Sequence, residues 1–228
     1  MRAFFYIIMD LFNQGIDWNE ILSPLVIKYK GKRHPLEYNT LFELIIAVLL
    51  SAQDSDEHIN KIMPKFLARY PNIGEIKKAN IEEIQAIISD VINSKNKAKW
   101  IYSIGQTVDS ELNIPLNLKE LIKLKGIGRK SANVILKIMK KPAEGIICDL
   151  HVIRVSSRIG LVKESKDGNK IEMELMQKFN YKTWNDIGMT LSFLGREICR
   201  PTNPKCSNCI INSNCNFYNQ KTRRKSYY

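Results

Sequence analysis

The stretch from Leu124 to Asn133, LKGIGRKSAN, constrains this chain most, because two closely spaced glycines separate two segments with helical character. Asn117 can cap the incoming helix, with Glu120 three residues later as its capping-box partner. Gly126 and Gly128 permit a sharp turn and leave backbone N–H groups uncovered. The outgoing helix then begins near Gly128, where free N–H groups and the positive end of the helix dipole can bind a phosphate. The sequence therefore predicts a helix, a tight hairpin and a second helix.

Three charged residues follow this turn and are candidates for binding or catalysis. Arg129 adds a fixed positive charge beside the helix terminus, and Lys130 lies in the first turn. Asp149 comes about twenty residues later and is expected to cap a helix that ends near Ile159. From these residues alone, an ion pair between Lys130 and Asp149 is the simpler interpretation.

Helical periodicity covers most of the chain, and sustained period-two alternation is almost absent, so we expect an all-α fold. The apolar segment 40–52 is too short for a membrane span and is predicted to be the central buried helix. Pro64 should kink the helix expected at 55–69 or end it early. The other helices are expected near 3–13, 17–30, 93–108, 117–140, 168–179 and 183–198, with a further short helix that starts at a capping box at 80–83.

Composition favours a polyanionic partner. The 228 residues carry 35 Lys and Arg against 23 Asp and Glu, which gives a net charge of +12. An apolar fraction of 44% is sufficient for a packed core. The apolar start is interrupted by Asp10 and has no small-residue cleavage site, so we read it as a core helix of an intracellular protein. The basic run 221–225 is expected to be a solvated, frayed terminus.

Four of the five cysteines form a cluster near the C-terminus, with six, two and five residues between successive members: Cys199, Cys206, Cys209 and Cys215. In a cytoplasmic protein, such a set indicates a metal centre rather than disulfides. Tetrahedral zinc is the generic interpretation, although a single C-x-x-C pair is unusual for a zinc ribbon. A [4Fe–4S] cluster also takes four thiolates, and the spacing alone leaves both open. The fifth, Cys148, is expected to be an inert buried thiol.

The hairpin, the Lys130–Asp149 spacing and the cysteine set together resemble the endonuclease III family of helix-hairpin-helix DNA glycosylases. The resemblance covers residues 40–215 and implies that Lys130 attacks the sugar while Asp149 assists. It also implies a [4Fe–4S] cluster on the four cysteines. Two departures are Lys125, where a proline is usual, and Leu150, where a threonine is usual. They put the choice of substrate in doubt more than the class of reaction.

The same resemblance implies a set of DNA contacts and a division of the chain. The hairpin would grip a phosphate, Gln53 and Val91 would fill the gap left by an extruded base, and basic residues would dock the backbone. The contact residues are Gln53, Val91, Lys125, Gly126, Gly128, Arg129, His151, Arg200 and Lys205. A six-helix barrel is expected at 37–145, and a discontinuous, cluster-bearing domain at 1–36 and 146–228.

The expected chemistry begins with attack of the neutral lysine amine on C1′ of the damaged nucleotide, which leaves a Schiff base that undergoes β-elimination. An ordinary lysine has a pKa of about 10.4, so a neutral amine costs about 4 kcal/mol near neutral pH. A helix N-terminus supplies only ~0.3–1 kcal/mol, or ~2 when partly buried. Desolvation on DNA, or proton transfer to Asp149, must therefore supply the rest.

We accordingly expect a bifunctional DNA glycosylase and AP lyase that removes oxidised pyrimidines from duplex DNA. It would act as a monomer in the cytoplasm, on the nucleoid. One alternative is a monofunctional mismatch glycosylase for thymine, uracil or adenine, although such relatives usually lack lysine at position 130. The other is a non-catalytic DNA-binding module, which would need neither Lys130 nor Asp149.

Overall fold

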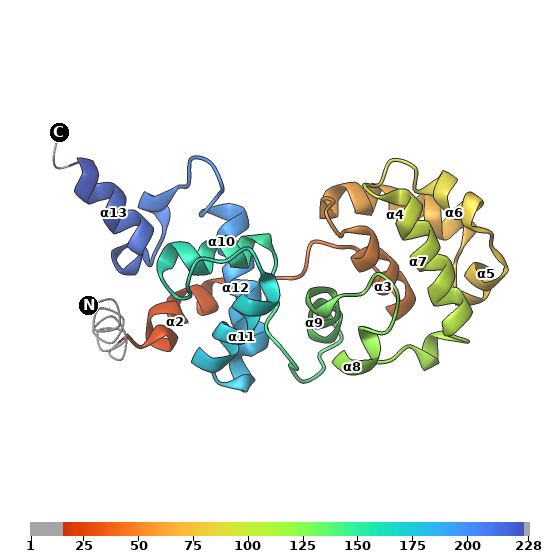
Figure 1. Cartoon of the computed structure of the whole chain (residues 1–228), viewed down its shortest axis with the longest axis horizontal. Coiled ribbons are helices and arrows are strands. Elements are labelled where there is room, and N and C mark those ends of the chain that lie inside the picture. The colour runs from red at the N-terminus through yellow and green to blue at the C-terminus, as the bar shows by residue number, and fades with distance from the viewer. Residues whose placement is uncertain (1–15, 226–228) are drawn as a thin grey trace, which may run out of the picture. The chain divides into compact units, whose positions relative to one another are not determined.

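The computed structural model describes residues 16–225, and every regular element in this range is a helix. The all-α prediction is therefore confirmed for the described residues, while the helix expected at 3–13 lies outside them. The α-helices are α2 (Trp18–Tyr29), α3 (Leu41–Leu50), α4 (Asp56–Arg69), α5 (Ile73–Lys78), α6 (Ile81–Ile87), α7 (Ser94–Thr107), α8 (Leu118–Leu121), α9 (Arg129–Ile138), α10 (Leu150–Ile159), α11 (Gly168–Lys178), α12 (Trp184–Glu197) and α13 (Asn216–Lys225) (Figure 1). Short 3₁₀ helices cover Glu111–Asn113, Tyr181–Thr183, Cys206–Asn208 and Asn212–Asn214.

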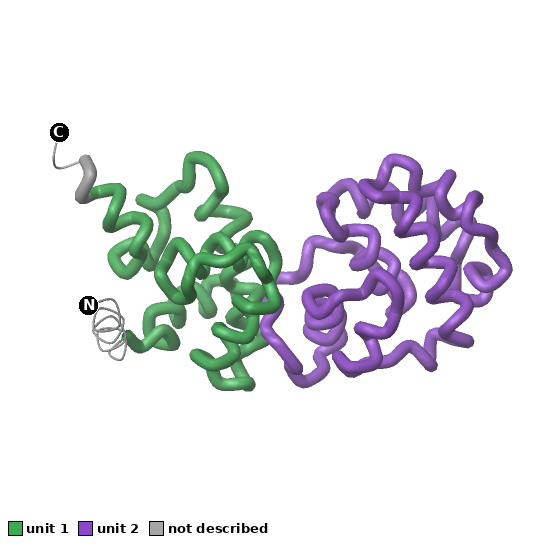
Figure 2. Tube along the Cα trace, viewed as in Figure 1, with its two compact units in different colours: residues 1–30, 148–228 green, residues 31–147 purple. Residues whose placement is uncertain are grey.

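The chain divides into two compact units (Figure 2). Unit 2 is continuous, runs from Gly31 to Ile147 and contains α3 to α9. Unit 1 joins the chain up to Lys30 with the chain from Cys148 onward, so it contains α2 and α10 to α13. The predicted nucleophile therefore belongs to unit 2, and the predicted aspartate and cysteine set belong to unit 1.

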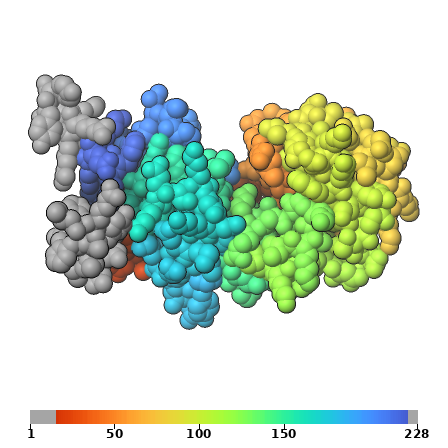
Figure 3. Space-filling model, viewed as in Figure 1, coloured from red at the N-terminus to blue at the C-terminus, as the bar shows by residue number. Residues whose placement is uncertain are grey.

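The core of unit 2 is built around α3. Every residue from Leu44 to Leu50 is buried, and α3 packs against α4, α7 and α9. Thr40 starts the helix by accepting a hydrogen bond from the backbone N–H of Glu43 at 3.2 Å. Figure 3 shows the face of unit 2 in this view covered mostly by its yellow and green segments. The prediction of a central buried helix is confirmed.

The helix α4 does not end early at Pro64, contrary to one of the two expected outcomes, but continues to Arg69. A proline inside a helix removes one backbone hydrogen bond and crowds the preceding turn. The helix nevertheless buries Ile59, Met63 and Phe66 on one face. The burial of this apolar face offsets the destabilising effect of the proline on the helix. The sequence pattern alone does not show which of these two effects is larger.

The core of unit 1 is the packing of α12 against α10 and α2. The ring of Tyr29, at the end of α2, lies 5.6 Å from the ring of Phe193 in α12. The hydroxyl of Tyr29 donates a hydrogen bond to Glu197 at 3.2 Å. These contacts join the segment of unit 1 that precedes unit 2 to the segment that follows unit 2, so the two segments fold as one unit.

Two further observations concern the apolar and basic extremes of the sequence. Within residues 16–225, none of the helices has both the length and the apolar character needed to cross a membrane. The basic run at 221–225 was expected to be frayed, but it forms the last part of α13, which extends from Asn216 to Lys225.

Candidate active site

The helices α8 and α9 form the predicted hairpin. Asn117 caps α8 by accepting a hydrogen bond from the backbone N–H of Glu120 at 2.9 Å. Gly126 has a φ of +84°, and a Cβ at this position would lie 2.7 Å from a ring carbon of Trp100. Gly128 is the N-cap residue of α9, and among the described residues no atom would lie within 4 Å of a Cβ there. The turn therefore requires glycine at 126, and the N-terminus of α9 stays open.

Lys130 is the second residue of α9 and directly follows Arg129. Both side chains are partly exposed, whereas the following residues from Ser131 to Leu136 are buried. Lys125 is exposed in the turn itself. Three basic residues thus lie at the N-terminal end of α9, where the helix dipole also favours an anion.

Asp149 caps α10, as the sequence predicted, and is held on both carboxylate oxygens. Oδ1 accepts hydrogen bonds from the backbone N–H groups of His151 at 2.9 Å and Val152 at 2.8 Å. Oδ2 accepts a hydrogen bond from the hydroxyl of Ser192 at 2.6 Å, and the guanidinium of Arg196 lies 3.9 Å away. The side chain is only 12% exposed. Its partners lie in α10 and α12, so both helices together fix the orientation of the carboxylate.

His151, in the first turn of α10, is linked to the cysteine loop through Arg154. The Arg154 guanidinium lies 3.2 Å from His151 Nδ1 and donates hydrogen bonds to the carbonyls of Gly195 and Cys199, both at 3.0 Å. Burial lowers the pKa of His151, and the positive charges of Arg196 and Arg154 lower it further, while Asp149 opposes them. A neutral imidazole at physiological pH follows from this balance.

The four clustered cysteines follow α12 in a loop that ends at α13. Arg158 of α10 holds this loop, since its guanidinium donates hydrogen bonds to the carbonyls of Arg200 at 2.7 Å and Pro201 at 2.9 Å. It also lies 3.5 Å from the sulfur of Cys199. The side chains of Arg200 and Lys205 are exposed, which leaves both able to meet a partner.

The thiols of the loop influence one another electrostatically. Burial raises the pKa values of Cys209 and Cys215, and negative charge on Cys199 and Cys206 adds to the increase in both. Within residues 16–225 no three ligating side chains are already gathered in the arrangement of a metal site. Four cysteines within one short loop nevertheless form a donor set whose chemistry suits a thiolate-bound metal centre.

Cys148 fits its predicted role as an inert thiol. Its side chain is 7% exposed, and burial, reinforced by the negative charge of Asp149, raises its pKa to about 12. A thiol with so high a pKa holds almost no thiolate near neutral pH, and the thiolate is the reactive form.

The two residues predicted to enter the DNA stack differ in exposure. Gln53 is exposed and adopts a left-handed backbone with a φ of 63°. Val91 is only 2% exposed, so its side chain belongs to the core and cannot reach a base. The next residue, Ile92, is 52% exposed. The burial of Val91 counts against the expected wedge role, and the neighbouring apolar side chain that is exposed belongs to Ile92.

Sequence reasoning missed several residues that hold the site in place. Ser192 is 2% exposed and bonds Asp149, but a serine within an apolar helix carries no distinguishing signal. Lys97 is 1% exposed although lysine is almost never fully buried, and no pattern in the sequence sets it apart from the exposed Lys95 and Lys99. Only tertiary contacts identify these two residues.

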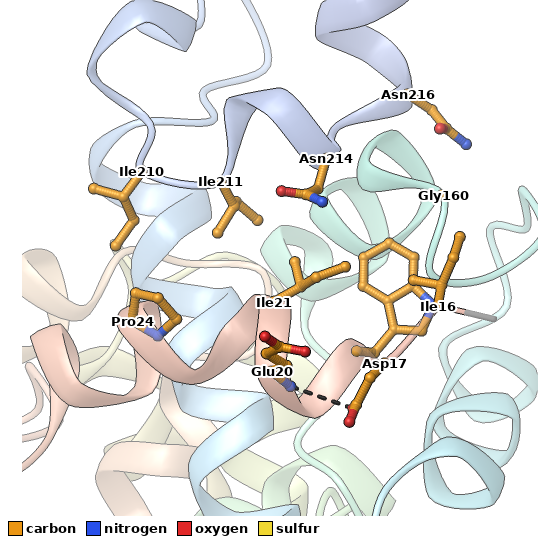
Figure 4. A pocket seen from close by; sticks show the side chains of 11 residues that line it. Ile16, Asp17, Glu20, Ile21, Pro24, Gly160, Ile210, Ile211, Asn214 and Asn216 are labelled. Carbon is orange, nitrogen blue, oxygen red and sulfur yellow. Dashed lines mark hydrogen bonds between the residues drawn. The ribbon is translucent and has the colours of Figure 1, made fainter.

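A cavity of about 620 Å³ lies within unit 1, between the first turns of α2 and the end of the cysteine loop (Figure 4). Asp17 and Glu20 border it on one side, where Asp17 caps α2 and accepts a hydrogen bond from the backbone N–H of Glu20. Ile210 and Ile211 border it on the other side. None of the predicted site residues lines this cavity.

Comparison with known proteins places these features in one class. The family model for HhH-GPD superfamily base excision DNA repair proteins matches residues 46–181. An endonuclease III from Synechocystis sp. is 33% identical over 198 residues, which cover 86% of this chain and 90% of that protein. An endonuclease III from Thermotoga maritima is 32% identical over 195 residues, which cover 83% of this chain and 90% of that protein.

Solved structures agree with this placement. A trapped covalent intermediate of an endonuclease III with DNA has a TM-score of 0.82 at 28% identity, covering 90% of this chain and 97% of that one. A non-covalent endonuclease III–DNA complex has a TM-score of 0.82 at 29% identity, covering 90% of this chain and 96% of that one. Fold and sequence thus define a base excision repair DNA glycosylase of the helix-hairpin-helix superfamily. Within that class, the chain belongs to the endonuclease III family.

Proposed function

We propose that this enzyme removes oxidised pyrimidines from double-stranded DNA through a lysine Schiff base and cleaves the resulting abasic site by β-elimination. The observation that carries the proposal is the position of Lys130, in the first turn of α9 and directly after the open N-terminus at Gly128. A phosphate bound at that terminus would bring a deoxyribose near the lysine amine. The covalent intermediate with DNA of a related endonuclease III supports this chemistry.

Lys130 and Asp149 divide the chemical work. The Lys130 amine attacks C1′, the C1′–N bond to the base breaks, and the base leaves with the electron pair. Asp149 accepts the proton that the amine loses and stabilises the positive charge that develops on the sugar. The C1′–O4′ bond then breaks and O4′ takes up a proton, which leaves a Schiff base between Lys130 and C1′. Transfer of a C2′ proton to water then forms the C2′–C3′ double bond and expels the 3′ phosphate. Because Ser192 and two backbone N–H groups hold the carboxylate, it needs little reorganisation to act.

The remaining predicted residues bind DNA in this proposal. The turn residues contact a phosphate through backbone N–H groups and basic side chains, and Gln53 with Ile92 fills the space left by the extruded nucleotide. The side chain of His151, the guanidinium of Arg200 and the ammonium of Lys205 contact the DNA backbone. The turn residues are Lys125, Gly126, Gly128 and Arg129. The enzyme acts as a monomer on the nucleoid, in the cytoplasm.

The four clustered cysteines would hold a [4Fe–4S] cluster. Four thiolates are the usual ligands of such a cluster, and Arg158 already lies beside the sulfur of Cys199. When bound, the cluster would supply a covalent cross-link that fixes the loop carrying Arg200 and Lys205. Visible absorbance with bound iron and sulfide in the purified protein tests this assignment, and a colourless protein with stoichiometric zinc would overturn it.

The domain assignment follows the same proposal. We assign residues 37–145 to the six-helix barrel with the hairpin, and residues 1–36 with 146–228 to the discontinuous domain that carries the cysteines. The division of the described chain after Lys30 and Ile147 supports this assignment.

Borohydride trapping tests the proposed reaction. Wild-type protein incubated with duplex DNA that contains one thymine glycol should form a covalent adduct, and Lys130→Ala should form none. The matched control is Lys78→Ala, because the Lys78 side chain is 73% exposed and pairs with Glu75. It should leave the adduct yield unchanged.

Two other outcomes would change the conclusion. Base release without an adduct, revealed by later treatment with alkali, would indicate a monofunctional glycosylase in which Lys130 binds rather than reacts. Neither adduct nor release, on thymine glycol or on mismatched uracil and thymine, would indicate a DNA-binding module without catalysis.

A further inference from the structure

Two loop tips of unit 2 are joined by buried polar groups that the reaction itself does not use. The first tip, Ser51 to Ser55, follows α3 and carries Gln53. The second tip, Val91 to Asn93, precedes α7 and carries Ile92. Each tip contains one left-handed residue other than glycine, since φ is 63° at Gln53 and 60° at Asn93. Such a backbone persists only where surrounding contacts enforce it.

Lys97 provides the first link between the tips. It lies in α7, four residues after Asn93, and its side chain is 1% exposed. Its ammonium donates hydrogen bonds to the carbonyls of Leu50 and Ala52, both at 2.7 Å. A cation placed there satisfies carbonyls at the C-terminal end of α3, which lack partners within the helix. The first tip is therefore tied to the helix that begins at the second.

Asp54 provides the second link. Its side chain is 7% exposed, and Oδ2 accepts a hydrogen bond from the backbone N–H of Ile92 at 3.0 Å. Oδ1 accepts from the backbone N–H of Ser55 and lies against Nδ1 of His58, both at 2.8 Å. Burial acts to raise the pKa of Asp54, but the hydrogen bonds from Ile92, His58 and Ser55 outweigh it and lower the pKa. The carboxylate thus stays charged while it joins the two tips.

These links hold two exposed side chains of different chemistry at a fixed separation. Gln53 offers an amide, and Ile92 offers an apolar side chain that is 52% exposed. An apolar side chain can wedge between base steps, and an amide can hydrogen-bond the edge of a base that has lost its partner. Burying a charged lysine costs stability, and the hydrogen bonds to the carbonyls of Leu50 and Ala52 offset that cost only while both loop tips keep this arrangement.

We propose that Lys97 and Asp54 form a clamp that positions Gln53 and Ile92 for insertion into the DNA stack, which makes them positioning residues for base extrusion. The inference rests on the proposed glycosylase function and adds two residues to it. Neither residue touches the reacting atoms in this scheme. A loosened clamp should therefore slow the extrusion of a stacked base and leave the chemistry at the sugar intact.

Two DNA substrates separate these steps. Single-turnover rates are measured on duplex DNA with thymine glycol opposite adenine and on the same duplex with a preformed abasic site. The first substrate requires extrusion of a stacked base, and the second requires β-elimination alone. Lys97→Met should reduce excision of thymine glycol by about 10- to 100-fold, the effect of a small misplacement of a positioning group. Cleavage of the abasic site should stay within about threefold, a near-neutral change on this scale.

Further variants test whether the clamp acts through Gln53. Asp54→Ala should show the same selective loss, and it decides the matter if Lys97→Met does not fold. Lys99→Met replaces an exposed lysine of the same helix and should change neither rate. Combining Lys97→Met with Gln53→Ala should reduce excision no further than Gln53→Ala alone, because residues that act through one another are not additive.

The remaining outcomes overturn the clamp. Equal losses on both substrates, unchanged rates on both, or full additivity in the double variant would refute it while leaving the glycosylase function standing. A wild-type protein inactive on both substrates would refute the proposed function and the clamp together.

Discussion

Asp149 performs a structural and a chemical task, and two substitutions should separate them. Asparagine caps a helix about as well as aspartate does, so Asp149→Asn should keep the bonds from His151 and Val152. In the asparagine variant an amide nitrogen replaces Oδ2, so the Ser192 hydroxyl has to turn and accept a hydrogen bond from it. The expected loss of stability is then that of the missing charge at the helix N-terminus, about 0.3–1 kcal/mol. Asp149→Ala loses the cap, worth about 1 kcal/mol. It also leaves the buried hydroxyl of Ser192 without its acceptor, at a cost of about 1–3 kcal/mol.

Together these contributions make Asp149→Ala less stable than the wild type by about 3 kcal/mol. In a chain of this size, each kcal/mol lowers Tm by about 2–4 °C, so Tm should fall by about 6–12 °C for alanine and by less than about 4 °C for asparagine. Both variants should lose at least about 100-fold in the rate of adduct formation, because proton transfer by a positioned side chain contributes about 10²–10⁴-fold.

Thermal unfolding followed by circular dichroism, alongside borohydride trapping, measures both effects. Asp167 provides the matched control, because it caps α11 through the backbone N–H groups of Asn169 at 2.9 Å and Lys170 at 3.3 Å. Asp167→Ala should cost about 1 kcal/mol and leave the trapping rate unchanged. An asparagine variant at 149 as unstable as the alanine variant would refute the capping argument. An asparagine variant that traps DNA within tenfold of the wild-type rate would refute the role of the carboxylate charge.

Three further predictions concern the hairpin, the metal centre and the acid stability. Gly126→Ala should lower the free energy of unfolding by at least about 2 kcal/mol in urea titration, since it combines a left-handed φ with a close approach to Trp100, whereas Gly128→Ala should cost less than about 1 kcal/mol. Cys206→Ala should lose bound iron and visible absorbance, while Cys148→Ala should keep both; equal iron content in the two proteins would contradict the ligand assignment. The stability gap between wild type and Asp54→Asn should shrink below pH ~4, because a carboxyl whose folded-state pKa is lowered stabilises only while it is ionised. A gap that stays constant in acid urea titrations would rule out that linkage.

Local features of the site were predictable from the sequence because they depend on neighbouring residues. The cap of Asn117 on α8, the turn at Gly126 and the cap of Asp149 on α10 each involve atoms within a few residues. The central burial of α3 was equally readable, since an apolar segment of that length has few alternatives in water.

Features that depend on the packing of distant segments were not predictable. The family resemblance aligned Val91 with a position that enters the DNA stack, but Val91 is buried in the structure and Ile92 beside it is exposed. Pro64 was expected to kink or end its helix, but α4 continues past it because its apolar face is buried.

Lys130 was singled out as the candidate nucleophile through a family resemblance, whereas the all-α class, the hairpin and the four-cysteine set could be predicted from the order of the residues. In these cases either the order of residues along the chain defines the feature, or its hydrogen bonds close within one turn. The hydrogen bonds from Lys97 to Leu50 and Ala52, and from Ser192 to Asp149, arise from the packing of the helices. Those bonds join groups more than 40 positions apart along the chain, and which polar side chains lose contact with water depends on how the helices pack.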